Sequence, residues 1–179
     1  MEVTELLKSY KEGSVSLQDT LHLLRKQGIE DLGFAKIDSG RQARTGIPEV
    51  IYSAGKTKEQ IKQIVERMHH SGVDILATRA SEEIFEGVKE IVPDARFNSL
   101  AKTIVFHHNH REKTQGYIAI VAAGTSDMPV AEEAAETAEF LGNSVERIYD
   151  VGVAGIHRLF SKIELIKEAR VIVVVAGME

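Results

Sequence analysis

The sequence predicts an α/β protein, with a small N-terminal α+β domain over residues 1–112 and a three-layer, parallel-sheet domain over residues 113–179. Two observations in the second part indicate this class. Expected strands alternate with expected helices, and two strands are near-continuous apolar runs, IAIVAA and VIVVVA. Such runs are typical of a parallel sheet that helices cover on both faces. The boundary is placed where a polar stretch follows a short strand.

The N-terminal domain is expected to mix short strands with helices whose first residues carry capping signals. Ser16 stands three residues before Asp19, and Thr57 stands three residues before Gln60. This spacing is typical of a helix start. We expect helices over residues 2–11, 16–28, 57–72 and 81–91, and strands over 34–38, 49–52, 73–78 and 103–106. The predicted core includes two helical stripes, Leu17, Leu21 and Leu24, then Ile61, Ile64, Val65 and Met68. Residues 41–48 are expected as a basic turn.

The C-terminal domain is expected to bring three loops to one edge of its sheet. Its predicted elements are strands over 117–123, 147–151 and 171–176 and helices over 130–141 and 155–169. Ligands of parallel sheets bind at the carboxyl ends of the strands. The loops that follow these strands carry Asp127, His157 and Glu179, so the three side chains are predicted to converge.

The loop after the first of these strands reads Gly124, Thr125, Ser126 and Asp127. Small residues let backbone N–H groups approach an anion, and the N-terminus of the following helix adds about half a positive charge. Asp127 suits a ribose hydroxyl or an amine. The alternative is an ordinary helix start, because Ser, Asp and an early Pro are common there. The pattern alone leaves both interpretations open.

Composition excludes several classes of protein. Of the 179 residues, 43% are hydrophobic and 27% charged, and no apolar run approaches the length of a membrane span. The net charge of −5 argues against nucleic-acid binding, and the acidic start of the chain shows no secretory signal. We therefore expect a cytoplasmic protein with no membrane partner. The absence of cysteine excludes disulfides, thiolate metal sites and thiol nucleophiles within this sequence.

Three histidines in the polar connection, His107, His108 and His110, raise the question of a metal site. Their spacing matches no familiar set of carboxylate and histidine ligands. A surface loop is therefore the favoured interpretation.

Residues 117–179 resemble the aminoimidazole ribonucleotide carboxylases of purine biosynthesis. That family has a Gly-Ser-x-Ser-Asp loop, then a helix, then a His-Arg pair after the second strand. Here the loop is Gly124 to Asp127 and the pair is His157 and Arg158. The resemblance implies a flavodoxin-like fold that binds a nucleotide and adds or moves CO2. The sequence departs from the family's Ser-Ala-His-Arg, because Gly155 and Ile156 precede the pair.

The whole chain more closely resembles the LarB family, the pyridinium-3,5-biscarboxylic acid mononucleotide synthases of nickel-pincer nucleotide synthesis. Its motifs include LGFA at residues 32–35, GIPEVI at 46–51, GKT at 55–57 and ATR at 77–79. They continue with GTSDMPVAEEA at 124–134, YDVGVAGIHR at 149–158 and VAGME at 175–179. The resemblance implies carboxylation of the pyridinium ring of nicotinic acid adenine dinucleotide and hydrolysis of its phosphoanhydride, which releases AMP.

The same resemblance implies CO2 or bicarbonate as co-substrate, no organic cofactor, and a homo-oligomer. Mg²⁺ is a candidate, because hydrolysis of a phosphoanhydride calls for neutralisation of charge. Family members use a cysteine to add to the electrophilic pyridinium ring. Because this chain has none and stops directly after a strand, we expect it to be a fragment with an uncovered strand edge.

Site roles follow from the resemblance and from residue chemistry together. Ser126 and Asp127 are expected to hold the ribose or phosphate, with Gly124, Thr125 and Arg158 beside them. The predicted catalytic residues are His157 as proton shuttle, Asp150 as the group that orients it or holds a metal-bound water, and Glu179 as an acid–base carboxylate. Candidate clamps for phosphate or carboxylate are Arg41, Arg44, Lys56 and Arg79, each of which is by default a solvated charge.

Two other functions stay open at the level of sequence. An aminoimidazole ribonucleotide carboxylase or mutase would explain the C-terminal domain but would leave the basic N-terminal domain unused. A non-catalytic nucleotide-binding module would explain the missing cysteine.

Overall fold

The computed structural model describes residues 3–26, 29–38, 40–108 and 112–177. The chain divides into two compact units, residues 1–49 and residues 50–179. The sequence-based boundary after residue 112 falls inside the second unit, between its two sheets, and stays a prediction. Within the described residues, no helix is both long and apolar enough to cross a membrane.

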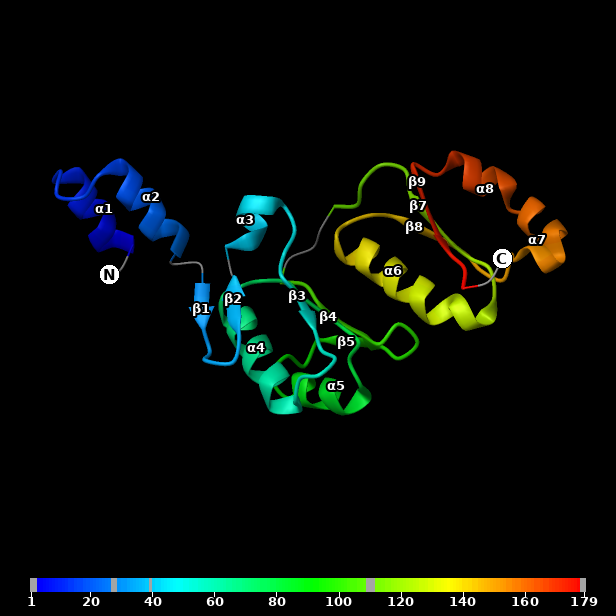
Figure 1. Ribbon diagram of the computed structural model, residues 1–179, viewed down its shortest axis with the longest axis horizontal. Coiled ribbons are helices and arrows are strands. Elements are labelled where there is room, and N and C mark those ends of the chain that lie inside the picture. Colours follow the sequence, from blue (N-terminus) through cyan, green and yellow to red (C-terminus); the bar gives the residue numbers. More distant parts are fainter. Residues whose placement is uncertain (1–2, 27–28, 39, 109–111, 178–179) are drawn as a thin grey trace. The chain divides into compact units, whose positions relative to one another are not determined.

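The first unit holds a pair of helices, a β-hairpin and a short third helix (Figure 1). Its elements are α1 (Val3–Lys11), α2 (Leu17–Lys26), β1 (Ile29–Asp31), β2 (Lys36–Asp38) and α3 (Arg41–Thr45). The predicted start of α2 is confirmed, because the Asp19 N–H donates to Ser16 Oγ at 3.0 Å. The predicted basic turn is wrong, since residues 41–45 complete a helical turn that ends at Gly46.

The apolar stripe predicted for α2 is wrong at two positions. Leu17 and Leu21 are 54% and 44% exposed, whereas Leu6 of α1 and Thr20 are buried. A unit of this size encloses only a few side chains, so part of an amphipathic stripe stays in solvent.

A mixed four-stranded sheet forms the first half of the second unit. Its elements are β3 (Val50–Tyr52), α4 (Lys58–His70), β4 (Ile75–Thr78), α5 (Glu82–Lys89), β5 (Arg96–Asn98) and β6 (Thr103–Phe106). The strand order is β3-β4-β6-β5, and only β3 and β4 are parallel. The predicted capping box of α4 and its buried stripe are both confirmed. The sequence did not predict β5, which, like β1, is only three residues long.

A parallel three-stranded sheet forms the second half. It contains β7 (Ile118–Ala122), the 3₁₀ turn η1 (Thr125–Asp127), α6 (Met128–Phe140), β8 (Val145–Ile148), η2 (Val153–Gly155), α7 (Ile156–Phe160), α8 (Ile163–Glu168) and β9 (Val171–Val175). The order is β8-β7-β9. Alternate residues of β7 face α6 on one side and α7 and α8 on the other. The predicted parallel α/β sheet is therefore confirmed.

Two predicted boundaries in this sheet are wrong for local reasons. β8 ends at Ile148 because Asp150 has a left-handed φ of 58°, which no extended strand accommodates. The helix predicted over residues 155–169 is two helices, since Lys162 at the junction has φ −112° and ψ 6°, outside the α-helical range.

α6 packs on both sheets of the second unit. Ala131 and Ala135 pack against β7. At its carboxyl end, Phe140 is buried against Leu76 of β4 and Val105 of β6. The two sheets therefore share α6 as common support.

His107 and His108 are half-buried, whereas residues 112–115 of the predicted surface loop are exposed. His107 stacks on Phe140 with ring centroids 4.9 Å apart, and His108 stacks on His69 of α4 at the same distance. His110 lies outside the described residues. Among those described, no group of three His, Cys, Asp or Glu side chains is placed to hold a metal ion.

Arg147 of β8 joins the sheet to α6 through two carboxylates. Its Nε lies 3.0 Å from Glu132 Oε1, and its terminal nitrogens donate to Glu139 at 2.8 and 2.9 Å. We expect Arg147→Met to lower the free energy of unfolding by about 1–2 kcal/mol, because it leaves Glu139 without its donor and Glu132 with the Tyr149 hydroxyl as its remaining side-chain donor. Urea unfolding at pH 7 measures this loss.

The matched control is Lys167→Met, since Lys167 pairs with Glu164 in solvent and such pairs contribute under about 1 kcal/mol. An Arg147 variant no less stable than this control would contradict the assignment.

His69 makes the stability depend on pH. Burial lowers its pKa below 6.5, and the neighbouring His108 and His70 lower it further. The unfolded chain therefore binds the proton more readily. The contribution of neutral His69 is complete above about pH 6.5 and is lost as the pH falls below that value.

We expect the free energy of unfolding to fall between pH 7 and pH 5 less steeply in His69→Gln than in the unmodified protein. Urea titrations at several pH values measure the slope. His157→Gln, which changes an exposed imidazole, is the control. Equal slopes in all three proteins would rule out His69 as the source.

Candidate functional site

A cavity of about 480 Å³ lies at the carboxyl edge of the three-stranded sheet. Chain order explains its position: β7 continues through α6 to β8 on one side, and the next crossover brings β9 to the other side of β7. Loops diverge where the strand order reverses in this way, which leaves a crevice. The lining includes Gly124, Ser126, Asp127, Asp150, Arg158 and Gly177.

Asp127 joins the two loops that flank the crevice. One carboxylate oxygen accepts the Gly124 N–H at 3.0 Å, and the other accepts the Gly177 N–H at 3.1 Å. The predicted approach of the loops after β7 and β9 is thus present. Each carboxylate oxygen has a second lone pair, so Asp127 can still accept a hydroxyl or an amine from a ligand.

Arg158 supplies the positive charge of the cavity. It forms an ion pair with Asp150, whose left-handed backbone turns the chain from β8 into the loop. The loop stays close to the strand edge because the Gly152 N–H donates to Ala123 O at 2.8 Å. A Cβ on Gly152 would lie 2.8 Å from that same oxygen, so only glycine fits there.

The charges favour different ligand groups at the two ends of the cavity. Asp127 already places a carboxylate at the start of α6, which offsets the positive end of the helix. A hydroxyl donor is therefore favoured beside Asp127 over a phosphate. An anionic group is favoured at Arg158, where a guanidinium can bind it through two parallel hydrogen bonds.

The remaining residues of the predicted loop motif are placed around this edge. Thr125 and Ser126 are exposed in η1, and Ser126 lines the cavity. His157 is exposed in α7 and is not part of the lining, because successive helical side chains diverge by about 100° and Arg158 takes the inward direction. Glu179 lies outside the described residues. The catalytic roles of His157, Asp150 and Glu179 stay predictions.

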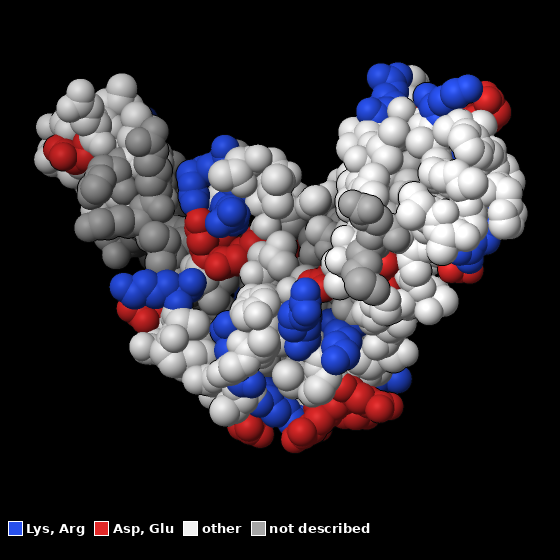
Figure 2. Space-filling model, turned by 45° about the vertical axis from the view of Figure 1, so that its right-hand side comes forward, with Lys and Arg blue, Asp and Glu red and all other residues white. Residues whose placement is uncertain are grey.

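Of the four predicted basic clamps, Lys56 and Arg79 belong to the same unit as this cavity and do not line it. Lys56 donates to Tyr52 O at 2.6 Å, and Arg79 Nε lies 3.0 Å from Glu133 Oε2 of α6. Arg44 pairs with Asp38 within the first unit, and Arg41 is exposed in α3 of that unit. On the face drawn in Figure 2, lysines and arginines form several groups, and acidic residues lie beside several of them.

Sequence reasoning missed the part that backbone groups play in the site. Gly177 contributes its backbone N–H, which donates to Asp127. Gly152 and Ala154 line the cavity because their loop runs close to the strand edge. The signal available was a glycine shortly after each of the strands β8 and β9.

Two comparisons with known proteins bear on this chain. A family model described as the LarB/PurE-like N-terminal domain matches residues 29–110. An uncharacterized protein of Methanocaldococcus jannaschii is 39% identical over 186 aligned residues, which cover 98% of this chain and 72% of that protein.

The bridging role of Asp127 is testable without a ligand. An Asn side chain has one acceptor oxygen, so Asp127→Asn can serve only one of the two backbone N–H groups. We expect the free energy of unfolding to fall by about 1–2 kcal/mol and amide hydrogen exchange at Gly124 or Gly177 to become faster. Asp94→Asn, in an exposed turn, is the control. Unchanged exchange at both glycines would contradict the bridge.

Proposed function

The chain belongs to the LarB family of LarB/PurE-like carboxylases, and from that premise we propose that it binds nicotinic acid adenine dinucleotide for carboxylation of its pyridinium ring and hydrolysis of its phosphoanhydride. The observation that supports this most is the Asp127 bridge beside a cavity that also contains Arg158. Together they offer an acceptor for a ribose hydroxyl and a cation for a phosphate or a carboxylate.

The reaction has two parts with different demands. In the carboxylation, a nucleophile adds to the ring, a ring carbon then forms a bond to CO2 and loses its proton, and the nucleophile leaves. In the hydrolysis, water breaks the phosphoanhydride and AMP is released. CO2 or bicarbonate is the proposed co-substrate, without an organic cofactor. We assign the nucleophile to no residue of this sequence, which contains no cysteine.

The described residues support binding and charge neutralisation. Arg158 can donate to a phosphate oxygen while Asp150 keeps the guanidinium in place. The carboxylates do not form a set for a protein-held metal ion, because Asp127 accepts two backbone N–H groups and Asp150 pairs with Arg158. We therefore derive no step through Mg²⁺. Assembly into a homo-oligomer is proposed from the family alone.

Calorimetric titration with nicotinic acid adenine dinucleotide tests the proposal. We expect binding that weakens about tenfold in Asp127→Asn and in Arg158→Gln, since each change removes a charge-assisted hydrogen bond worth about 1.5 kcal/mol. Lys162→Gln, which removes an exposed cation between α7 and α8, is the control.

Aminoimidazole ribonucleotide is titrated in parallel. If it binds and the dinucleotide does not, the purine-type carboxylase replaces our proposal. If neither ligand binds, the proposal fails for this chain.

A further inference from the structure

A second cavity, of about 340 Å³, lies at the carboxyl edge of the four-stranded sheet. It is lined by Arg79, Ser81, Glu82, Phe97, Ser99 and Lys102. The parallel strands β3 and β4 end beside one another, since Ser53 N–H donates to Thr78 O at 2.9 Å. Apart from Arg79, these side chains belong to none of the roles derived above.

The two basic residues of the lining have strained backbones. Arg79 and Lys102 have φ values of 55° and 54°, in the left-handed region that costs a non-glycine residue about 1 kcal/mol or more. Ala80, in the turn between β4 and α5, links the two backbone segments, because its N–H donates to Lys102 O at 2.8 Å. The backbone positions from which two long cationic side chains reach the cavity are thereby held together.

The hydrogen-bond donors that line this cavity are only partly paired with acceptors of the protein. Arg79 contacts Glu133 through Nε, and no hydrogen bond of its two terminal nitrogens is found within the described residues. Ser81 Oγ accepts the Ile84 N–H at 3.3 Å, which leaves the hydroxyl proton for another acceptor. Within the same described residues, Lys102 has no ion pair.

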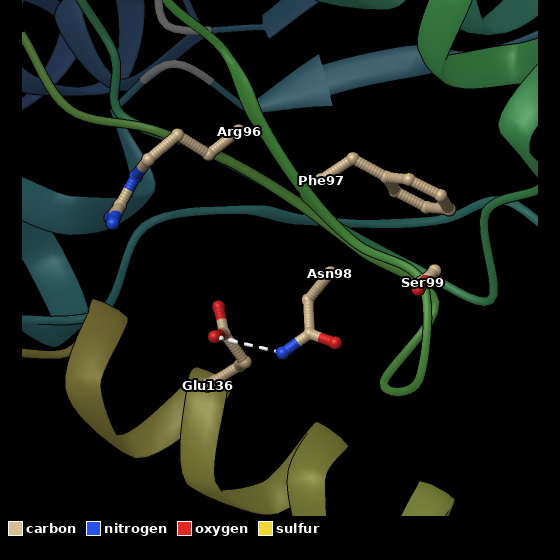
Figure 3. Close-up of a pocket in the computed structure, with 5 residues that line it drawn as sticks. All are labelled: Arg96, Phe97, Asn98, Ser99 and Glu136. Carbon is tan, nitrogen blue, oxygen red and sulfur yellow. Dashed lines mark hydrogen bonds between the residues drawn. The ribbon is translucent and has the colours of Figure 1, made fainter.

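Phe97 gives the cavity a flat apolar wall. Its ring is stacked on Phe85 of α5, with centroids 5.1 Å apart and an interplanar angle of 17°. Figure 3 shows Phe97 pointing away from Glu136, whereas Asn98, the next residue of β5, turns toward Glu136 and donates to it at 3.1 Å. Phe97 thus lines both this cavity and the neighbouring pocket drawn in Figure 3, to which Asn98 and Glu136 also belong.

We propose that this cavity binds a flat ring that carries an anionic group, with the anion at Arg79 and Lys102 and the ring against Phe97. Both nicotinic acid mononucleotide and AMP have this chemistry. Glu82 in the lining opposes the anion and would limit the affinity.

The position of the cavity relates it to the crevice at Asp127. α6 begins beside Asp127 and reaches Glu133, the partner of Arg79, six residues later. Six helical residues rise about 9 Å, which an extended dinucleotide exceeds. The cavity is thus a second subsite for the proposed dinucleotide. This last step rests on the proposed function, while binding of a ring-bearing anion does not.

Calorimetric titrations with AMP and with nicotinic acid mononucleotide test the inference. We expect Lys102→Gln to weaken binding of at least one of them about tenfold, the effect of one lost charge-assisted hydrogen bond. Glu82→Gln should strengthen the same binding, and Lys11→Gln on the first unit should leave it unchanged. Phe97→Leu should weaken binding of the mononucleotide more than binding of inorganic phosphate, which has no ring. The ligand affected identifies the half of the dinucleotide that binds here.

Two results would overturn the inference. One is that neither mononucleotide binds. The other is that Lys102→Gln and Glu82→Gln leave binding unchanged while all variants keep their fold, as measured by circular dichroism. Dinucleotide binding that needs Asp127 but is indifferent to Lys102 overturns this subsite and leaves the proposed function standing. Mononucleotide binding that depends on Lys102, without any binding of the dinucleotide, supports the site and overturns the proposed function.

Discussion

The hydrogen bonds that Asp127 accepts from two loops are the interaction on which the candidate site depends. Gly124 lies three residues before Asp127 and Gly177 lies 50 residues after it, and one carboxylate serves both backbone N–H groups. The sheet makes this meeting possible, because β7 has neighbours on both sides and its two crossovers cover opposite faces. The crevice is therefore a consequence of strand order, and Asp127 sets how closely its walls approach.

This part of the fold can be predicted well from the sequence. A parallel strand buried on both faces must be apolar throughout, so the run in β7 predicted the sheet directly, and the similar run in β9 belongs to an edge strand that is largely exposed. The cap at Thr57 and the stripe ending at Met68 predicted α4 in the same way. Each of these signals is local. They were sufficient because the strong periodicity of a long helix leaves few alternative structures.

The failures have a different physical origin. β5 has three residues and owes its strand conformation to pairing with β6, which no local pattern reveals. The end of β8 depends on a left-handed aspartate. Among the site residues, the sequence grouped His157 with Asp127, whereas the phase of α7 turns Arg158 toward the cavity. Contacts between distant segments, such as Arg79 with Glu133, are likewise invisible in a single sequence.

α6 relates the two cavities to each other. Its first residue follows Asp127, its middle holds Glu133 against Arg79, and its last residue, Phe140, is buried on the other sheet. A helix fixed at both ends transmits position as a rigid element, so the spacing between Asp127 and Arg79 is set by helical rise and not by loop conformation. A ligand that touches both would therefore be selected by its length as well as by its charges. In this proposal a mononucleotide suits either cavity, but only a ligand with a hydroxyl and an anionic group at one end and a flat ring and an anionic group at the other suits the two together.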